Sequence, residues 1–172
     1  GYLTTVLDNQ GNQTATLVAS GSNRKYVTID EIPINLQHAF VAIEDERFYD
    51  HNGIDLQGIL RAGLKGVASG FHFSEGASTI TQQLLKNTVF TQWTSEQSMA
   101  DKFERKFQEQ YLALQLEKVV DKDWILENYL NAINLGQNTL GVGVASERYF
   151  GKDVSELTLS ECAVLAAITQ SP

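Results

Sequence analysis

Residues 39–51 begin as an apolar run and end in acidic, basic and aromatic side chains that could do acid–base chemistry. If this segment is one helix, at 100° per residue, four side chains share one face: Glu44, Arg47, Phe48 and His51. A carboxylate held where an apolar surface meets a cleft is partly desolvated, which favours its use as a general base. A solvated acidic end of a core helix would have the same sequence, so this segment alone leaves both interpretations open.

A turn rich in glycine, small residues and hydroxyls follows at residues 75–79. It would open a helix whose free N–H groups and positive dipole end favour an anion. Along that helix four polar side chains occupy one arc of roughly 100°: Thr79, Gln82, Gln83 and Lys86. With Ser78 in the turn they suit phosphate or sugar hydroxyls, although an ordinary N-cap followed by a polar surface stripe would look the same.

A third cluster lies in residues 102–111, where Arg105 and Lys106 precede Glu109 by four and three positions on an expected helix. Such pairs are often surface ion pairs worth only tenths of a kcal/mol, and that interpretation is strong for this cluster taken alone. The functional interpretation is a clamp for a diphosphate. The two cations would then hold Glu109 ionised, as a partner for a metal or another cation.

The composition excludes several classes of protein. The 172 residues suffice for one domain with its own core, and the apolar fraction of 42% is typical of a globular chain. The net charge of −8 argues against nucleic acid as a partner, so any anion site must be local. One cysteine, Cys162, excludes an internal disulfide and a cysteine-rich metal site. No stretch has the apolar length of a membrane span. The way the sequence begins and ends leads us to expect an excised domain.

The elements that must position these side chains are mainly helical. Alternating residues predict a small β-hairpin in a β-rich N-terminal segment, 1–27, and the helical region occupies 28–172 of a single domain. A capping box at Thr28 and Glu31, followed by Pro33, predicts that helix begins near there. Helices are predicted at 37–51, 55–69, 79–87, 100–120, 122–133, 144–150 and from the Thr158 cap to Ile168, with a loop at 135–143.

The segment 88–99 is the least regular part of the chain and contains Phe90, Trp93 and Met99 among polar residues. It could be a mobile lid or a surface that touches lipid. A loop that packs its aromatic side chains onto the core is an equally good interpretation.

The chemical stretches together resemble the peptidoglycan glycosyltransferase domain of class A penicillin-binding proteins and their monofunctional relatives, over essentially the whole chain. Five segments carry the resemblance in order: 44–55, 76–87, 105–109, 122–131 running into 141–146 and 149–152, and 157–167. Where many relatives have a doubled alanine, this chain has Ala145 and Ser146, a departure that should not touch the chemistry.

The resemblance implies a lysozyme-like helical fold with a membrane-facing lobe, and polymerisation of lipid II into β-1,4-linked glycan with release of undecaprenyl diphosphate. It implies that Glu44 is the general base on the acceptor 4-hydroxyl, in an inverting reaction. The departing diphosphate would be supported by Glu109, Arg105, Lys106 and Lys86, with a divalent ion, expected to be Mg²⁺, bound at Glu109 through the diphosphate. Further substrate-binding residues would be Asp45, Arg47, Ser78, Thr79, Gln82 and Gln83.

The same resemblance implies partners and a location. The partners would be lipid II, the growing glycan strand, the bacterial membrane surface and moenomycin-type inhibitors, with a C-terminal transpeptidase domain in the full-length protein. The location would be the outer face of the bacterial cytoplasmic membrane, anchored by an N-terminal transmembrane helix outside this sequence. The family's domain usually continues for some further helices, so we expect this chain to be truncated at its C-terminus.

Two other functions remain open at this point. A lysozyme-like glycan hydrolase could use Glu44 as an acid, but it would have no use for three cations gathered on one site. A non-catalytic module could bind glycan or lipid diphosphate without turnover.

Overall fold

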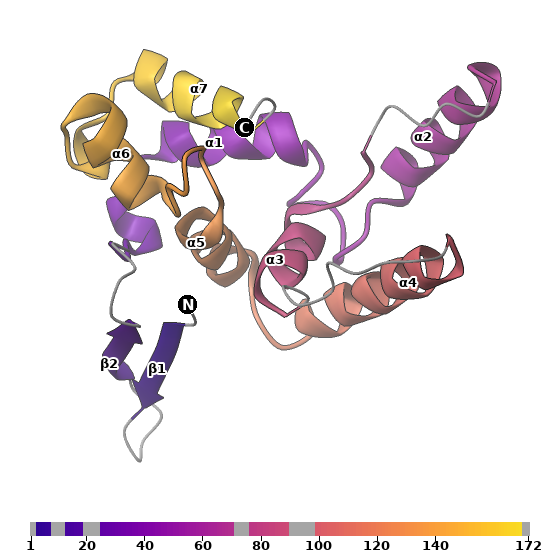
Figure 1. The fold of residues 1–172 in the computed structure, drawn as a ribbon, viewed down its shortest axis with the longest axis horizontal. Helices are drawn as coiled ribbons and strands as arrows, with labels where there is room; N and C mark the ends of the chain where they lie inside the picture. Colours follow the sequence, from indigo (N-terminus) through magenta and orange to yellow (C-terminus); the bar gives the residue numbers. More distant parts are fainter. Residues whose placement is uncertain (1–2, 8–12, 19–24, 71–75, 90–98, 170–172) are drawn as a thin grey trace.

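Residues 3–7, 13–18, 25–70, 76–89 and 99–169 are described by the computed structural model, and most of them are helical, as the sequence predicts. Strands β1 (Leu3–Leu7) and β2 (Gln13–Val18) pair antiparallel, with Leu3 opposite Val18. The helices follow in the order α1 (Ile34–Glu44), α2 (Leu56–Ala68), α3 (Ile80–Thr88), α4 (Met99–Leu116), α5 (Lys122–Ala132), α6 (Val142–Phe150) and α7 (Leu159–Ile168), with short 3-10 helices η1 (Ile29–Glu31) and η2 (Val154–Glu156) (Figure 1).

Helix α5 lies at the centre of the core. Its side chains Ile125, Leu126 and Leu130 are fully buried, and the ring of Tyr129 meets that of Phe40 from α1 edge to face, with centroids 6.3 Å apart. Helix α3 packs beside α5, and α7 packs along α1. Burial of these large apolar side chains stabilises the arrangement of the helices that carry the candidate residues.

Helix α1 ends at Glu44, so the predicted single helix over 37–51 is wrong, and so is the single face shared by Glu44, Arg47, Phe48 and His51. Asp45 adopts an extended conformation with φ −161°, and turns follow through Asp50. Tertiary contacts explain why the helix ends here. The turn after Asp45 places the Phe48 ring in the core, where it is fully buried. Tertiary contacts of this kind override a local helical pattern.

The predicted N-caps at Thr79 and Thr158 are confirmed. The Thr79 side chain accepts a hydrogen bond from the Gln82 N–H, and the Thr79 N–H donates to Gln82 Oε1. Thr158 and Glu161 form the same reciprocal pair at the start of α7. Thr28 and Glu31, in contrast, cap only the short helix η1, and the longer helix begins after Pro33.

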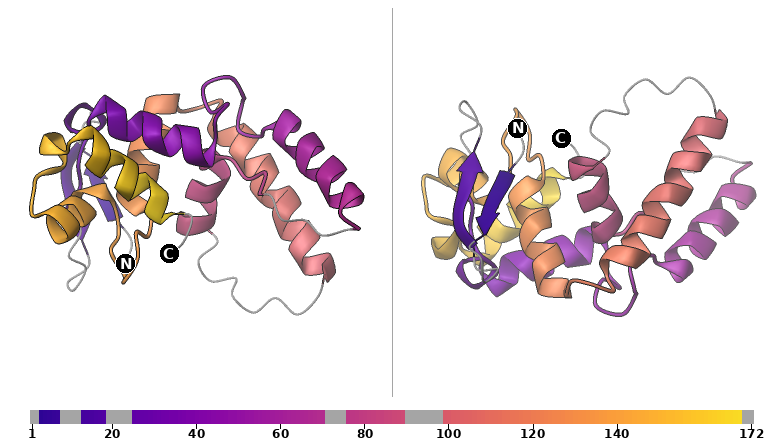
Figure 2. Two further views of the ribbon diagram at one scale, coloured as in Figure 1. Left: turned by 90° about the horizontal axis from the view of Figure 1, so that it is seen from above. Right: turned by 90° about the horizontal axis from the view of Figure 1, so that it is seen from below.

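The other helix boundaries agree with the sequence-based ranges to within about two residues, except that α4 ends at Leu116 and not near residue 120. Within the predicted loop over 135–143, Leu140 forms an isolated bridge with Asn134, which precedes the loop, and α6 begins at Val142. The segment 90–98, with Phe90 and Trp93, lies outside the described residues. Helices α2 and α4 both extend away from the remaining helices, on the same side of the molecule (Figure 2).

Glycine is required at position 53, where the chain has φ +114° and a Cβ atom would lie 2.6 Å from the Ala113 carbonyl oxygen. We therefore expect Gly53→Ala to lower the free energy of unfolding by about 2 kcal/mol or more, measured by urea denaturation. Gly63 lies within α2 with nothing near its Cβ position, so Gly63→Ala is the matched control and should be neutral or stabilising by up to about 1 kcal/mol. Equal stability of the two variants would contradict this account.

Candidate active site

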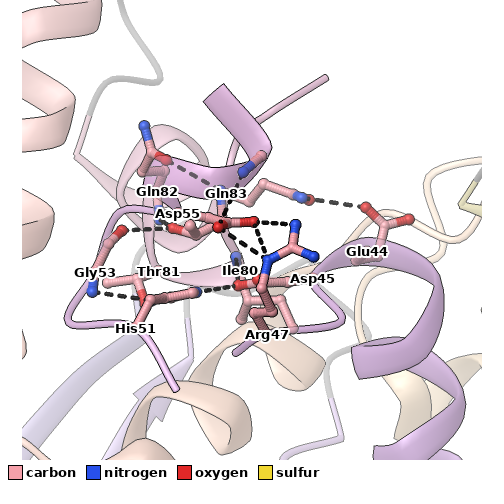
Figure 3. Close-up of polar contacts among 12 residues, drawn as sticks. Glu44, Asp45, Arg47, His51, Gly53, Asp55, Ile80, Thr81, Gln82 and Gln83 are labelled. Carbon is pink, nitrogen blue, oxygen red and sulfur yellow. Dashed lines mark hydrogen bonds and ion pairs between the residues drawn. The ribbon is translucent and has the colours of Figure 1, made fainter. Parts of the chain in front are cut away.

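Asp45 joins the turn after α1 to the start of α3. Its carboxylate is buried, accepts a hydrogen bond from the Ile80 N–H at 3.0 Å, and lies 2.7 Å from His51 Nε2 (Figure 3). The Gly53 N–H donates to His51 Nδ1, so that nitrogen is an acceptor and Nε2 carries the proton that is donated to Asp45. A carboxylate at a helix N-terminus is also favoured by the helix dipole.

The expectation of free N–H groups at the start of α3 is therefore wrong for two of them. The Ile80 N–H donates to Asp45, and the Gln82 N–H donates to Thr79 Oγ1. The anion that the helix terminus binds in this structure is a carboxylate of the protein itself. The Thr79 and Gln82 side chains are buried, and their predicted contacts with substrate stay predictions.

Arg47 is held by two carboxylates of the chain. Its guanidinium donates to Asp55 through Nη2 at 2.6 Å and also pairs with Glu46. Asp55 in turn caps α2 by accepting from the Gly58 N–H. The Arg47 guanidinium, helped by this N–H, holds the pKa of the Asp55 carboxyl below its usual range. Arg47 thus orients the beginning of α2 and lines the cleft described below.

The two glutamates singled out in the sequence are bound by neighbouring glutamines of α3. Gln83 Nε2 donates to Glu44 Oε2 at 3.1 Å (Figure 3). Gln82 Nε2 donates to Glu109 Oε1 at 3.2 Å. Glu44 stands at the end of α1 and Glu109 on α4, so α3 is the element that relates them. Three separate segments therefore meet here, although Glu109 is not among the residues that line the cleft described below.

The surroundings of the two carboxylates differ. Glu109 is buried and pairs with Lys106, whose Nζ lies 2.9 Å from Glu109 Oε1 and 2.6 Å from Ser78 Oγ. Glu44 is half-buried and is contacted by two neutral groups, the Gln83 amide and the Thr169 hydroxyl. The predicted i, i+3 pair of Lys106 and Glu109 is thus present.

The structure does not bring every predicted cation to this cluster. Lys86 is exposed in the last turn of α3 and forms no ion pair with Glu109 within the described part of the chain. Arg105 is half-buried on α4, next in sequence to Lys106. The predicted contacts of Lys86 and Arg105 with substrate stay predictions.

A polar cleft of about 220 Å³ opens between the end of α1, the start of α2 and the turn that precedes α3. Glu44 and Asp45 line one part of it, and Ser78 and Thr79 line another. Lys106 reaches the cleft indirectly, through its hydrogen bond to Ser78. A ligand in this cleft would therefore lie near the Glu44 carboxylate. It would also lie near the Ser78 hydroxyl, which accepts a hydrogen bond from Lys106.

Several residues near the cleft were not predicted from the sequence. The Tyr129 hydroxyl lies 3.4 Å from Gln83 Oε1, and burial, followed by the negative charges of Glu44 and Asp45, raises the pKa of Tyr129. Thr169 contacts Glu44 from 125 positions along the chain, and no local pattern marks it.

Lys122 was missed for the same reason. Its ammonium group donates to the His51 carbonyl at 2.7 Å, pairs with Glu117, and lies 4.5 Å from the centre of the Phe48 ring. Glu117 also accepts a hydrogen bond from Thr81. This network holds the turn that contains His51, and it is formed by residues that are far apart in the sequence.

Comparison with known proteins gives a consistent family. Residues 10–172 match the family model described as transglycosylase. The chain is 49% identical over 168 residues to penicillin-binding protein 1A of Clostridium perfringens (strain 13 / Type A), which covers 96% of this chain and 24% of that protein. It is 47% identical over 146 residues to penicillin-binding protein 1A of Escherichia coli (strain K12), covering 85% of this chain and 16% of that protein.

The chain thus spans about a fifth of the length of the curated relatives that it matches. The family match covers the candidate active site together with all the described helices. The chain belongs to the transglycosylase family, the peptidoglycan glycosyltransferase domain found in penicillin-binding proteins.

Proposed function

We propose that this chain polymerises lipid II, adding disaccharide units in β-1,4 linkage and releasing undecaprenyl diphosphate. The observation that carries the proposal is the placement of two glutamates beside α3. Gln83 binds Glu44 and Gln82 binds Glu109, while Lys106 of α4 pairs with Glu109. A glycosyl transfer from a diphosphate needs one base and one cationic support for the leaving group.

In the proposed reaction, the Glu44 carboxylate takes the proton of the acceptor 4-hydroxyl while that oxygen attacks the anomeric carbon. The bond to the diphosphate breaks, and the electron pair leaves with the diphosphate. Attack opposite the leaving group inverts the anomeric centre, which converts an α-diphosphate into a β-link. Lys106, beside Glu109 and Ser78, would stabilise the developing negative charge, together with Arg105 and Lys86 once substrate is bound.

A divalent ion, which we expect to be Mg²⁺, would be bound chiefly by the substrate diphosphate. Glu109 is the residue of this chain that would bind such an ion, and its carboxylate is held in place by Gln82 and Lys106. The described residues contain no group of three or more His, Cys, Asp or Glu side chains that could hold a metal, so the substrate would have to supply most of the ligands. The ion would neutralise charge on the leaving group.

Helices α2 and α4 form the proposed membrane-facing lobe of a lysozyme-like fold. Each exposes apolar side chains at helical spacing, more than half of the surface of each side chain being accessible: Leu56, Leu60, Leu64 and Val67 on α2, and Phe103, Phe107 and Tyr111 on α4. Amphipathic helices of this kind lie in the interface of a bilayer. None of the described helices is long and apolar enough to cross a membrane.

The remaining proposals concern the whole protein. By analogy with relatives named penicillin-binding protein 1A, we propose a transpeptidase domain beyond this chain, an N-terminal membrane anchor, and a location at the outer face of the cytoplasmic membrane. Moenomycin-type inhibitors would compete with lipid II for the cleft.

Glu44→Gln should abolish polymer formation from lipid II, because the amide cannot accept the proton. The change preserves shape, so the thermal unfolding temperature should stay within a few degrees. Glu156→Gln alters an exposed carboxylate on η2 and is the matched control, with unchanged activity expected. Full polymerisation by the Glu44 variant would refute the proposal, and digestion of purified peptidoglycan without lipid II incorporation would favour a hydrolase.

Lys106→Met should lower kcat for lipid II polymerisation by about 10²- to 10³-fold, since charge on the leaving group loses its support. It should also destabilise the fold by about 1–3 kcal/mol, because Glu109 is then buried without its cation. The double variant Lys106→Met/Glu109→Gln should regain stability in urea unfolding but not activity. Recovery of activity in the double variant would show that Lys106 acts only on stability.

Leu60→Ser and Phe107→Ser should each weaken binding to phospholipid vesicles by about tenfold, because each removes apolar surface from the proposed membrane-facing lobe. Vesicle co-sedimentation gives the measurement. Leu159→Ser and Val164→Ser remove comparably exposed apolar side chains from α7 and should leave vesicle binding unchanged. An equal loss in all four variants would place the membrane contact elsewhere.

A further inference from the structure

The carboxylate of Glu44 is held at both oxygens. Gln83 Nε2 donates to Oε2 at 3.1 Å, and the hydroxyl of Thr169 contacts Oε1. Thr169 is the residue that follows the last turn of α7, and its Oγ1 also lies 2.7 Å from the Ala166 carbonyl oxygen. Neither the motifs in the sequence nor the proposed chemistry assigns a role to this hydroxyl.

The hydrogen count makes Thr169 different from Gln83. A threonine hydroxyl has one hydrogen to donate and lone pairs that accept, while its two neighbours here are both acceptors when Glu44 is ionised. A hydrogen bond to a carboxylate is stronger than one to a neutral carbonyl, so the hydrogen then points at Glu44 Oε1. When Glu44 is protonated, its new O–H can donate to Thr169 Oγ1, and the threonine hydrogen turns to the Ala166 carbonyl.

Gln83 cannot reverse in this way. Because an ionised carboxylate only accepts, the amide nitrogen must face Glu44, and the amide oxygen is turned toward the Tyr129 hydroxyl at 3.4 Å. Tyr129 is fully buried, so it keeps its proton and remains a donor to this oxygen. The hydrogen bonds from Tyr129 to Gln83 and from Gln83 to Glu44 thus keep one direction. Glu44 Oε2 stays an acceptor in both protonation states of Glu44.

We propose that Thr169 is a positioning residue for Glu44, with a hydroxyl that reverses its hydrogen-bond direction when Glu44 takes the proton of the acceptor sugar. The proposal rests on the proposed role of Glu44 as the base. The acceptor O–H bond breaks and Glu44 Oε1 gains the proton. The threonine hydrogen turns to the Ala166 carbonyl, and the new O–H rotates toward Thr169 Oγ1, which then accepts from it. No heavy atom has to move, so the carboxyl group keeps its position through the transfer.

The test compares three variants of this chain in lipid II polymerisation. Thr169→Val removes the hydroxyl and keeps the shape, and it should lower kcat by about ten- to a hundredfold, with KM changed less than about threefold, the loss of one hydrogen bond to a charged group. Thr169→Ser restores the hydroxyl and should return kcat to within about threefold of the original. Should Thr169→Val fail to fold, Thr169→Ala takes its place with the same expectations.

Thr88→Val is the matched control. The Thr88 hydroxyl also donates to a backbone carbonyl at the end of a helix, that of Leu84 at 2.6 Å, and its described hydrogen bond involves no carboxylate. This variant should keep full kcat with a similar change in melting temperature. Equal losses of kcat in Thr88→Val and Thr169→Val would overturn the inference.

Two further outcomes separate the inference from the function on which it rests. Full activity of Thr169→Val together with an inactive Glu44→Gln would overturn the positioning role and leave the proposed function standing. A Thr169→Ser variant as slow as Thr169→Val would do the same. An active Glu44→Gln variant would overturn both.

Discussion

The buried carboxylate of Asp45 is the constraint on which the site depends. It accepts the first N–H of α3 and the proton of His51, and so fixes the turn after α1 against the start of α3. Burying a charge is costly unless it is hydrogen-bonded, and here a helix terminus and an imidazole supply the bonds. With that junction fixed, Glu44 ends α1 within reach of Gln83, and Gln82 on the same helix reaches Glu109.

Two carboxylates close to one helix have different surroundings. Lys106 provides a positive charge at Glu109, and its other contact, Ser78, lines the cleft. At Glu44, two of the hydrogen bonds come from neutral donors, Gln83 and Thr169. A transfer from a diphosphate needs this division, with charge support on the side of the leaving group and a base on the side of the acceptor.

Much of this could be predicted from the sequence, and the failures have a physical pattern. The caps at Thr79 and Thr158 and the pair formed by Lys106 and Glu109 depend on neighbours within four residues, so spacing alone identifies them. The break after Glu44 depends on partners on other elements, and the local pattern favoured continuing the helix. The N–H groups of α3 looked free for the same reason.

Contacts between distant segments were out of reach of sequence reasoning altogether. Thr169 meets Glu44 across 125 positions, and it follows an apolar helix with nothing to mark it. Tyr129 reads as a core residue, which it also is. Its hydroxyl becomes informative only once the fold places it next to Gln83.

The network around Lys122 joins two segments that are far apart in the sequence. One ammonium group binds Glu117, just beyond the end of α4, and the carbonyl of His51, in the turn behind the proposed base. A tilt of α4 that reached its C-terminal end would be transmitted to that turn through this cation. The segment after α4 and the turn that contains His51 are therefore joined through one side chain, so a displacement of either one would pull on the other.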